Sequence, residues 1–426
     1  MEKLNRTINP DFKLVTHVEM PQVKIIKLSN GLPVHILNGG SQELTKIDLM
    51  AKAGGIYSCH KLYSPITSLM LNEGTATRTP HEIAEVFDFY GAYFNPVAEK
   101  DNAFVTLFTL NKYLENTLPT YFDAVMNSTM PEKELDTVLQ RRLNNYLIES
   151  EKTSFLAREA FFENLFGANH PYGIKIKKEY YSEINRNDLM HFYKNHYQTG
   201  DFELILSGQI TDKVLNQVEK TFGNIEVSET TNSVGEISFE NKSNLIVIEK
   251  ADAVQSSIRM GLPSVTKLHP DYIGLKILTT IFGGYFGSRL MKNIREEKGY
   301  TYGIHAMLVS LSQSGYIAVA ADVKANHAKD AIVEIKNEIV KLQTELISPN
   351  ELALVKNYMM GELLQNLDGP MAISEAYKGV IQFGYGFNFH EDLKTTILNI
   401  TSEKLMELAR RYLDIEKMTT VVAGKY

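Results

Sequence analysis

The chain has 426 residues, which is too long for one ordinary hydrophobic core and favours two domains. Its 44% hydrophobic and 22% charged residues are typical of a soluble globular protein, and its net charge of −7 argues against binding to nucleic acid or to an anionic membrane. Cys59 is the only cysteine, which excludes an internal disulfide and a thiolate zinc site. No secretory signal or membrane-length apolar run is visible, so we expect a cytoplasmic protein.

The first predicted elements are a β-hairpin and a helix. Two strands over residues 23–37 flank the Asn-Gly dipeptide at 30–31, which is the strongest short signal for a hairpin turn. A helix is predicted over residues 79–89, with Thr79 as its cap and Glu82 completing a capping box. Strands, then helices, then a final strand recur in each half of the chain. This order predicts an α+β fold with an antiparallel sheet covered by helices in each half.

An internal repeat is the strongest sign of domain organisation. The matching pairs, in the same order and at nearly constant separation, are Phe166 and Phe383, Tyr197 and Tyr412, and Gly208 and Gly424. A polar, turn-rich stretch lies between the two copies. We therefore predict two tandem homologous domains over residues 1–225 and 244–426, joined by a linker over 226–243.

The stretch from Ile281 to Tyr302 carries the clearest chemistry. It predicts a glycine turn, a helix over about residues 288–298 that stops at Gly299, and then a strand. Arg295 near the helix end and Tyr302 after the turn offer a charged donor and a hydroxyl donor, which suit a peptide carbonyl or a developing oxyanion. The structural alternative is that the arginine favours a helix C-terminus and that the tyrosine simply opens a strand.

This stretch resembles the second-domain signature of the insulinase/pitrilysin zinc metallopeptidases, which include the mitochondrial processing peptidase subunits. In that family an Arg and a Tyr seven positions apart bind substrate and assist at the cleavage site, and they match Arg295 and Tyr302. The resemblance extends over nearly the whole chain, through the stretches 30–34, 74–83, 166–173 and 196–208. It implies half of a peptidase clamshell, and it implies that the turn containing Gly283, Gly284 and Gly287 contacts substrate.

The zinc site of the family is missing. Active members carry His-x-x-Glu-His on a helix, where the two His ligate zinc and the Glu activates water. Aligning on the Gly-Thr pair at 74–75 places Pro65, Ser68 and Leu69 at these three positions. The window 140–145, where a third ligand is expected, contains no acid. We therefore expect no cofactor in this chain, and zinc only on a partner.

Two further features concern ligand binding. The family docks its substrate strand beside a segment that here ends in Asn95 and Pro96, so Asn95 is a candidate substrate-binding residue. Pro96 has no N–H group, which weakens strand addition at that point. The glycines at 283, 284 and 287 precede a helix and would suit phosphate, but they lack the lysine-serine pair of a nucleotide loop.

Three hypotheses follow. The first is a non-catalytic, substrate-binding subunit of a two-chain zinc peptidase, which binds unfolded peptides and supplies Arg295 and Tyr302 to the zinc site of a homologous partner. The second is a catalytically dead homodimer that binds peptides or scaffolds a complex. The third is independent hydrolysis by other residues, and stoichiometric zinc in the purified chain would overturn our interpretation of residues 65–69.

Overall fold

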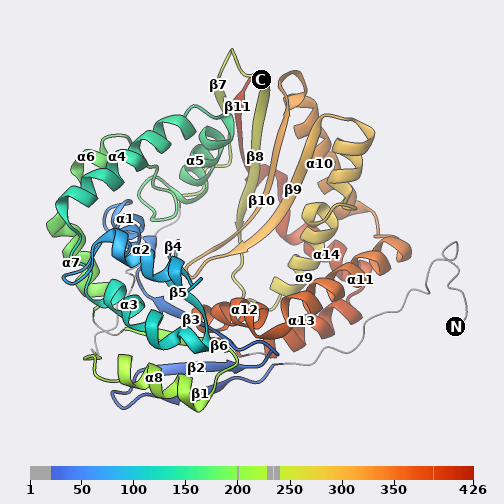
Figure 1. Ribbon diagram of the computed structural model, residues 1–426. Coiled ribbons are helices and arrows are strands. Elements are labelled where there is room, and N and C mark those ends of the chain that lie inside the picture. Colours follow the sequence, from blue (N-terminus) through green and yellow to red (C-terminus); the bar gives the residue numbers. More distant parts are fainter. Residues whose placement is uncertain (1–20, 199–200, 228–233, 235–239, 387) are drawn as a thin grey trace, which may run out of the picture.

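The computed structural model describes residues 21–198, 201–227, 234, 240–386 and 388–426 (Figure 1). Two β-sheets, each with its own helices, face an open interior. Most of the predicted linker over 226–243, and the first 20 residues, lie outside the described part of the chain. The predicted domain boundaries therefore stay a prediction.

The first sheet has six strands in the order β1-β2-β6-β3-β5-β4. Its strands are β1 (Lys24–Lys27), β2 (Pro33–Asn38), β3 (Leu44–Ala51), β4 (Tyr93–Ala98), β5 (Ala103–Leu110) and β6 (Phe202–Gly208). The second sheet has five strands in the order β7-β11-β8-β10-β9. Its strands are β7 (Leu245–Glu249), β8 (Gln255–Ser264), β9 (Thr301–Ser310), β10 (Gly315–Lys324) and β11 (Thr419–Gly424).

Helices follow the strands in both halves. Those of the first half are α1 (Tyr63–Met70), α2 (Pro80–Phe89), α3 (Leu114–Met126), α4 (Glu132–Glu149), α5 (Thr153–Phe166), α6 (Tyr180–Glu183), α7 (Arg186–His196) and α8 (Asp212–Phe222). Those of the second half are α9 (Tyr272–Thr279), α10 (Ala328–Thr344), α11 (Pro349–Asn366), α12 (Gly369–Phe383), α13 (Asn388–Asn399) and α14 (Ser402–Tyr412). Two π-helical segments, η3 (Thr280–Gly284) and η4 (Met291–Glu297), lie between α9 and β9. Short 3-10 helices are η1 (Gly55–Tyr57), η2 (Asn111–Tyr113), η5 (Ala325–His327) and η6 (Ile415–Lys417).

The α+β class and the duplication are confirmed, but the sheets are mixed and not wholly antiparallel. In each half the last strand pairs in parallel with an opening strand, β6 with β2 and β11 with β7. The hydrophobic alternation of a strand does not encode its direction, and a parallel pair needs a long crossover, which the intervening helices supply. Omitting β1, the strands of both sheets then follow the same spatial order relative to their order in the chain.

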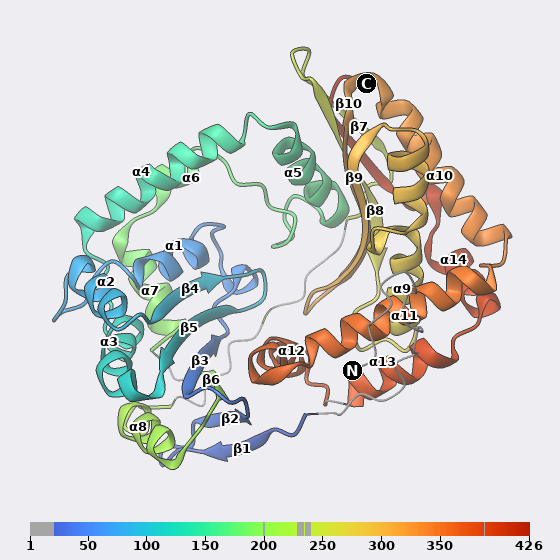
Figure 2. The same cartoon turned by 45° about the vertical axis from the view of Figure 1, so that its right-hand side comes forward.

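The two halves exchange one helix each. The apolar side of α5, with Phe161 and Leu165, packs on the second sheet against Tyr316 and Val421. In return α12 packs on the first sheet, where its Tyr377 contacts buried residues of β2 and β6. Figure 2 shows α5 beside β8 and α12 beside the lower sheet. Each sheet is thus covered on one face by a helix from the other half.

Local predictions at the turns hold. The hairpin of β1 and β2 turns through Gly31, which has a φ of 90°. The capping box of α2 is complete, since Thr79 and Glu82 each accept from the other's backbone N–H. Gly299 ends its helix with a φ of 65°, which is the left-handed geometry expected of a stop.

Candidate functional site

The helix that carries Arg295 is not a regular α-helix. The segment η4 winds as a π-helix, and Lys298 N donates to Asn293 O at 3.0 Å, five residues back. The predicted helix is therefore in place, but its winding differs from the prediction. π-helical turns are rare and occur frequently at functional sites, because they shift a side chain relative to the regular helix.

The strand that carries Tyr302 begins with a β-bulge. In the pairing of β9 with β10, Thr301 lies opposite Val323 and Ile304 lies opposite Ala321, with a shift of register between them. Two residues of β9, including Tyr302, therefore face a single residue of β10. The Thr301 hydroxyl supports the bulge, since it lies 2.7 Å from Asp322 O and accepts from Gly303 N at 3.1 Å.

The structure places Arg295 and Tyr302 on adjoining segments. Tyr300 N donates to Ile294 O at 3.0 Å, which ties the start of β9 to the π-helix. The Arg295 guanidinium lies 4.6 Å from the centroid of the Phe286 ring, while Tyr302 is 87% exposed. Within the described ranges no hydrogen bond joins the two side chains, so both remain available to a ligand or to another chain.

The duplication supplies an internal comparison for this segment. In the first half, α2 also ends at a left-handed glycine, Gly91 with a φ of 60°, and β4 follows it as an edge strand. The residues four before and three after this glycine are Phe87 and Phe94, whose rings stack at 4.9 Å. Arg295 and Tyr302 occupy the same two positions around Gly299. The path of the backbone can thus bring these two positions into contact, and the second copy has polar donors there.

The glycine turn has partly structural reasons for its composition. A Cβ at Gly283 would lie 2.5 Å from Ala306 N, so the close packing of η3 on β9 requires glycine there. A Cβ at Gly287 would lie 2.8 Å from the Tyr285 ring. Gly284 is exposed. Tyr285 stacks on Tyr358 at 4.9 Å, which links the turn to the wall of the interior cavity.

The helix α1 has the place of a zinc helix without its chemistry. It packs against α4, which carries residues 140–145, so the two elements that would hold the metal are adjacent. Pro65 and Leu69 are half-buried, while Ser68 is buried beside Tyr197. Burial of the Tyr197 side chain raises the pKa of its own hydroxyl. No group of three or more His, Cys, Asp or Glu side chains in the described part of the chain is arranged to hold a metal ion. The residues of α1 do not fit zinc.

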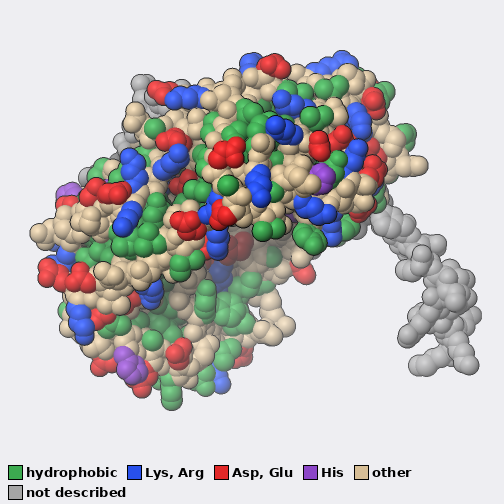
Figure 3. All heavy atoms as spheres, turned by 90° about the horizontal axis from the view of Figure 1, so that it is seen from above, with side chains coloured by type: hydrophobic (Ala, Val, Ile, Leu, Met, Phe, Trp, Pro, Cys, Tyr) green, Lys and Arg blue, Asp and Glu red, His purple; other side chains and the backbone are tan. Residues whose placement is uncertain are grey.

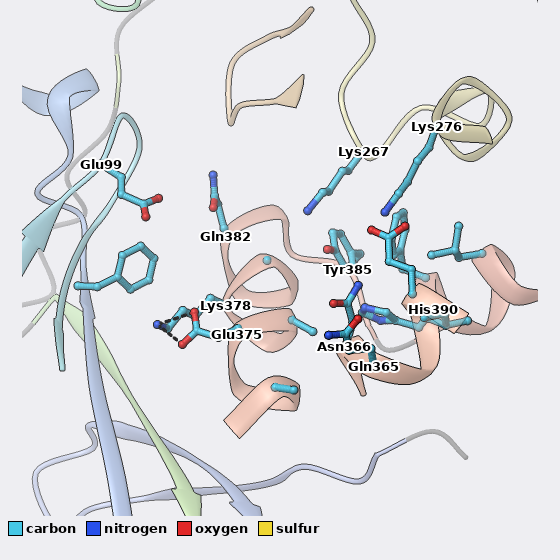
Figure 4. Close-up of a pocket in the computed structure, with 18 of the residues that line it drawn as sticks. Glu99, Lys267, Lys276, Gln365, Asn366, Glu375, Lys378, Gln382, Tyr385 and His390 are labelled. Atoms are coloured by element: carbon cyan, nitrogen blue, oxygen red, sulfur yellow. Dashed lines mark hydrogen bonds and ion pairs between the residues drawn. The ribbon is translucent and has the colours of Figure 1, made fainter. Parts of the chain in front are cut away.

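A cavity of about 1170 Å³ opens between the β4–β5 edge of the first sheet and helices α11, α12 and α13 (Figure 4). Its lining includes Asn95, but Arg295, Tyr302 and the three turn glycines lie outside it. The predicted site residues therefore fall in two places. On the face seen in Figure 3, acidic and basic side chains are interspersed around a hollow.

Sequence reasoning missed the basic wall of this cavity, formed by Lys267, Lys276 and His390. Burial and the nearby Lys276 lower the pKa of Lys267 to about 8. Burial and both lysines lower the pKa of His390 to about 4, so this imidazole is neutral at pH 7. The three residues are scattered along the chain, and their spacing carries no signal that would group them.

The chain is similar to proteins of the peptidase M16 family. Residues 183–359, which include Arg295 and Tyr302, match the family model described as "Peptidase M16 inactive domain". An "Uncharacterized zinc protease" of Rickettsia felis is 26% identical, covering 91% of this chain and 94% of its own. A "Non-peptidase homolog YmxG" of Helicobacter pylori is 21% identical, covering 96% and 94%.

The fold also matches a solved structure. A "peptidase M16 inactive domain" from Pseudomonas fluorescens superposes with a TM-score of 0.85 at 21% identity, covering 95% of this chain and 98% of that one. None of the described helices is long and apolar enough to cross a bilayer. The sequence match, the relatives and the shared fold agree with the resemblance found in the sequence. Residues 183–359 thus match a peptidase M16 inactive domain, the whole chain is similar to proteins named as zinc proteases or a non-peptidase homologue, and its sequence lacks the His-x-x-Glu-His motif.

Proposed function

We propose that this chain is the non-catalytic, substrate-binding subunit of a two-chain zinc peptidase that cleaves unfolded peptides. A homologous partner would supply the zinc, its His ligands and the Glu base. This chain would supply Arg295 and Tyr302 across the interface. Both side chains are donors, and both could bind the carbonyl oxygen of the scissile peptide as negative charge develops on it.

The observation that carries this proposal is the contrast between the two copies of the helix–glycine–strand segment. The first copy fills its two facing positions with stacked Phe87 and Phe94. The second copy has a π-turn and a bulge, and there Arg295 is half-buried and Tyr302 is exposed. Irregular backbone costs free energy and is commonly retained where it serves a site. Since α1 does not fit zinc, such a site would act on a metal held elsewhere.

The test is a mixing assay. The full chain is combined with a His-x-x-Glu-His homologue from the same cell, and kcat/KM for an unstructured peptide is measured. Arg295→Ala and Tyr302→Phe should each lower kcat/KM by roughly 10- to 1000-fold, as loss of a transition-state donor does. Lys292→Ala on the same helix and Tyr426→Phe should leave it unchanged. Full activity of both site variants would exclude the proposed role.

Pro96 favours a second candidate, a homodimeric peptide-binding or scaffold protein. Pro96 is buried in the edge strand β4, where a proline is tolerated only if its missing N–H faces the free edge. Substrate addition to this strand then loses one hydrogen bond. Co-purification separates the candidates, since a stable homodimer that ignores the zinc-bearing homologue supports the second.

A further inference from the structure

The wall of the cavity formed by the second half carries two partly buried lysines. Lys267, in the loop after β8, and Lys276, on α9, point into the cavity towards Tyr385 (Figure 4). Neither ammonium makes an ion pair with any residue that the structure describes. Burial and the neighbouring lysine both lower the pKa of Lys267, which shows that the local environment disfavours its charge.

Two other lysines of the same cavity behave differently. Lys46 lies 2.9 Å from Asp48, and Lys378 lies 3.2 Å from Asp48 and 2.9 Å from Glu375. Lys46 also pairs with Glu375, so two cations face two carboxylates. This balanced network fastens α12 to β3 and leaves no charge for a ligand. Lys267 and Lys276 are therefore the lysines of this cavity that form no ion pair among the described residues, and the unpaired carboxylates Glu99 and Glu362 also line it.

The helix α12 makes room for these donors with a glycine. A Cβ at Gly379 would lie 3.3 Å from Lys267 Nζ and 3.0 Å from the Tyr385 hydroxyl, so both groups converge on this point of the helix. Lys267 Nζ also lies 5.0 Å from the centroid of the Phe383 ring, a distance suited to a cation–π contact. An ammonium and a phenol that meet at one place offer two hydrogen bonds to a single anionic group.

We propose that Lys267, Lys276 and Tyr385 bind a carboxylate of the peptide that enters the cavity, either its C-terminus or an acidic side chain. The proposal rests on the proposed function in that it takes peptide as the ligand. It adds the substrate class, since peptides with a free carboxylate in reach of this corner bind more tightly than neutral ones. The cavity of about 1170 Å³ has room for several residues of extended chain.

Isothermal titration calorimetry of the full chain with three peptides tests this. The first is an unstructured peptide of about 12 residues, without acidic side chains and with a free C-terminal carboxylate. Fully extended, such a peptide is about 40 Å long. The second is its C-terminal amide, and the third is the amide with one central Glu. We expect at least one carboxylate-bearing peptide to bind about 10-fold more tightly than the plain amide, as a hydrogen bond to a charged group provides.

The variants Lys267→Met and Lys276→Met should reduce that ratio towards one while the amide keeps its affinity. Lys336→Met, on the exposed side of α10, should leave the ratio unchanged. Removing one of two repelling charges should not lower Tm, which shows that the variants are folded. A preference for the free acid identifies the C-terminus as the ligand group, and a preference for the Glu peptide identifies an acidic side chain.

The outcomes separate this inference from the proposed function. Equal binding of all three peptides overturns the carboxylate site while peptide binding stands. No binding of any of the three overturns it as well. A carboxylate preference that depends on Lys267 supports the inference. If the Arg295 and Tyr302 variants also retain full activity in the mixing assay, the catalytic role is excluded while the carboxylate site stands.

Discussion

The two copies of the helix–glycine–strand segment follow one path and have diverged in opposite directions. In the first half, α2 is a regular helix with a complete capping box, and β4 pairs without a register shift. In the second half, η4 is π-helical and β9 begins with a bulge. The left-handed glycine between helix and strand is common to both, with a φ of 60° at Gly91 and 65° at Gly299. Only the residues on either side of it have changed their role.

The difference shows that one copy of this segment packs into the core while the other leaves a side chain at its surface. In the first copy, Phe87 is 5% exposed and belongs to the hydrophobic core, and Phe94 packs against it. In the second copy, Tyr302 at the position that corresponds to Phe94 is 87% exposed. Burial of an aromatic ring stabilises the fold, while an exposed tyrosine on a bulge adds little. The first copy therefore serves stability, and the second is free to serve binding.

The largest expected effect is on the packed copy. Phe87→Ala should lower the free energy of unfolding by about 3–5 kcal/mol, because it leaves a cavity beneath Phe94. Arg295→Ala, at the equivalent position, should cost less than about 1 kcal/mol, since it removes one partly exposed cation–π contact. Urea unfolding of both variants measures the contrast. An equal loss of unfolding free energy in both variants would mean that Arg295 stabilises the fold as much as Phe87 does, and would contradict the contrast between the two copies.

The shared glycine should show an intermediate effect. Gly91→Ala and Gly299→Ala should each cost about 1–2 kcal/mol, because left-handed backbone is unfavourable for any residue with a Cβ. No atom lies within 4 Å of a Cβ built at either position, so steric clash adds nothing. Urea unfolding of the pair should give similar values. A difference of more than about 1 kcal/mol would show that the π-turn changes the strain at Gly299.

The bulge should give a smaller loss of stability than the two glycines. Thr301→Val removes the hydroxyl that bonds to both sides of the bulge and should cost about 1 kcal/mol by urea unfolding. In the mixing assay it should also lower kcat/KM, because the bulge orients Tyr302. Thr344→Val, which removes an exposed hydroxyl of α10, is the matched control for stability and activity. A Thr301→Val chain with unchanged kcat/KM would show that the bulge does not position Tyr302.

Local signals predicted the local structure well. The capping box of α2, the Asn-Gly hairpin and the stop at Gly299 each depend on a few neighbouring residues, whose preferences survive in the fold. The repeat predicted two related sheets. The parallel pairs were not predicted, because β2 and β6 lie at opposite ends of the first half in sequence and no local signal indicates that they pair. The π-turn and the bulge arise from the fit between segments, and no single residue type encodes them.

The candidate site was predictable only in part. Arg295 and Tyr302 stood out by spacing and family resemblance, and the loss of zinc ligands at residues 65–69 is visible in the sequence alone. The wall of Lys267 and Lys276 was not predictable, because it depends on which segments meet across the cavity. Such a grouping of distant residues becomes visible only when the tertiary structure is known.

The exchange of α5 and α12 has a consequence for how small this protein can be. One face of each sheet is covered by a helix from the other half, as in a dimer whose subunits have swapped a helix. A half produced alone would leave Tyr316 and Val421, or Leu37 and Ile205, exposed to water. The two sequence repeats therefore form a single folding unit. The smallest piece that can bury both sheets is the complete pair.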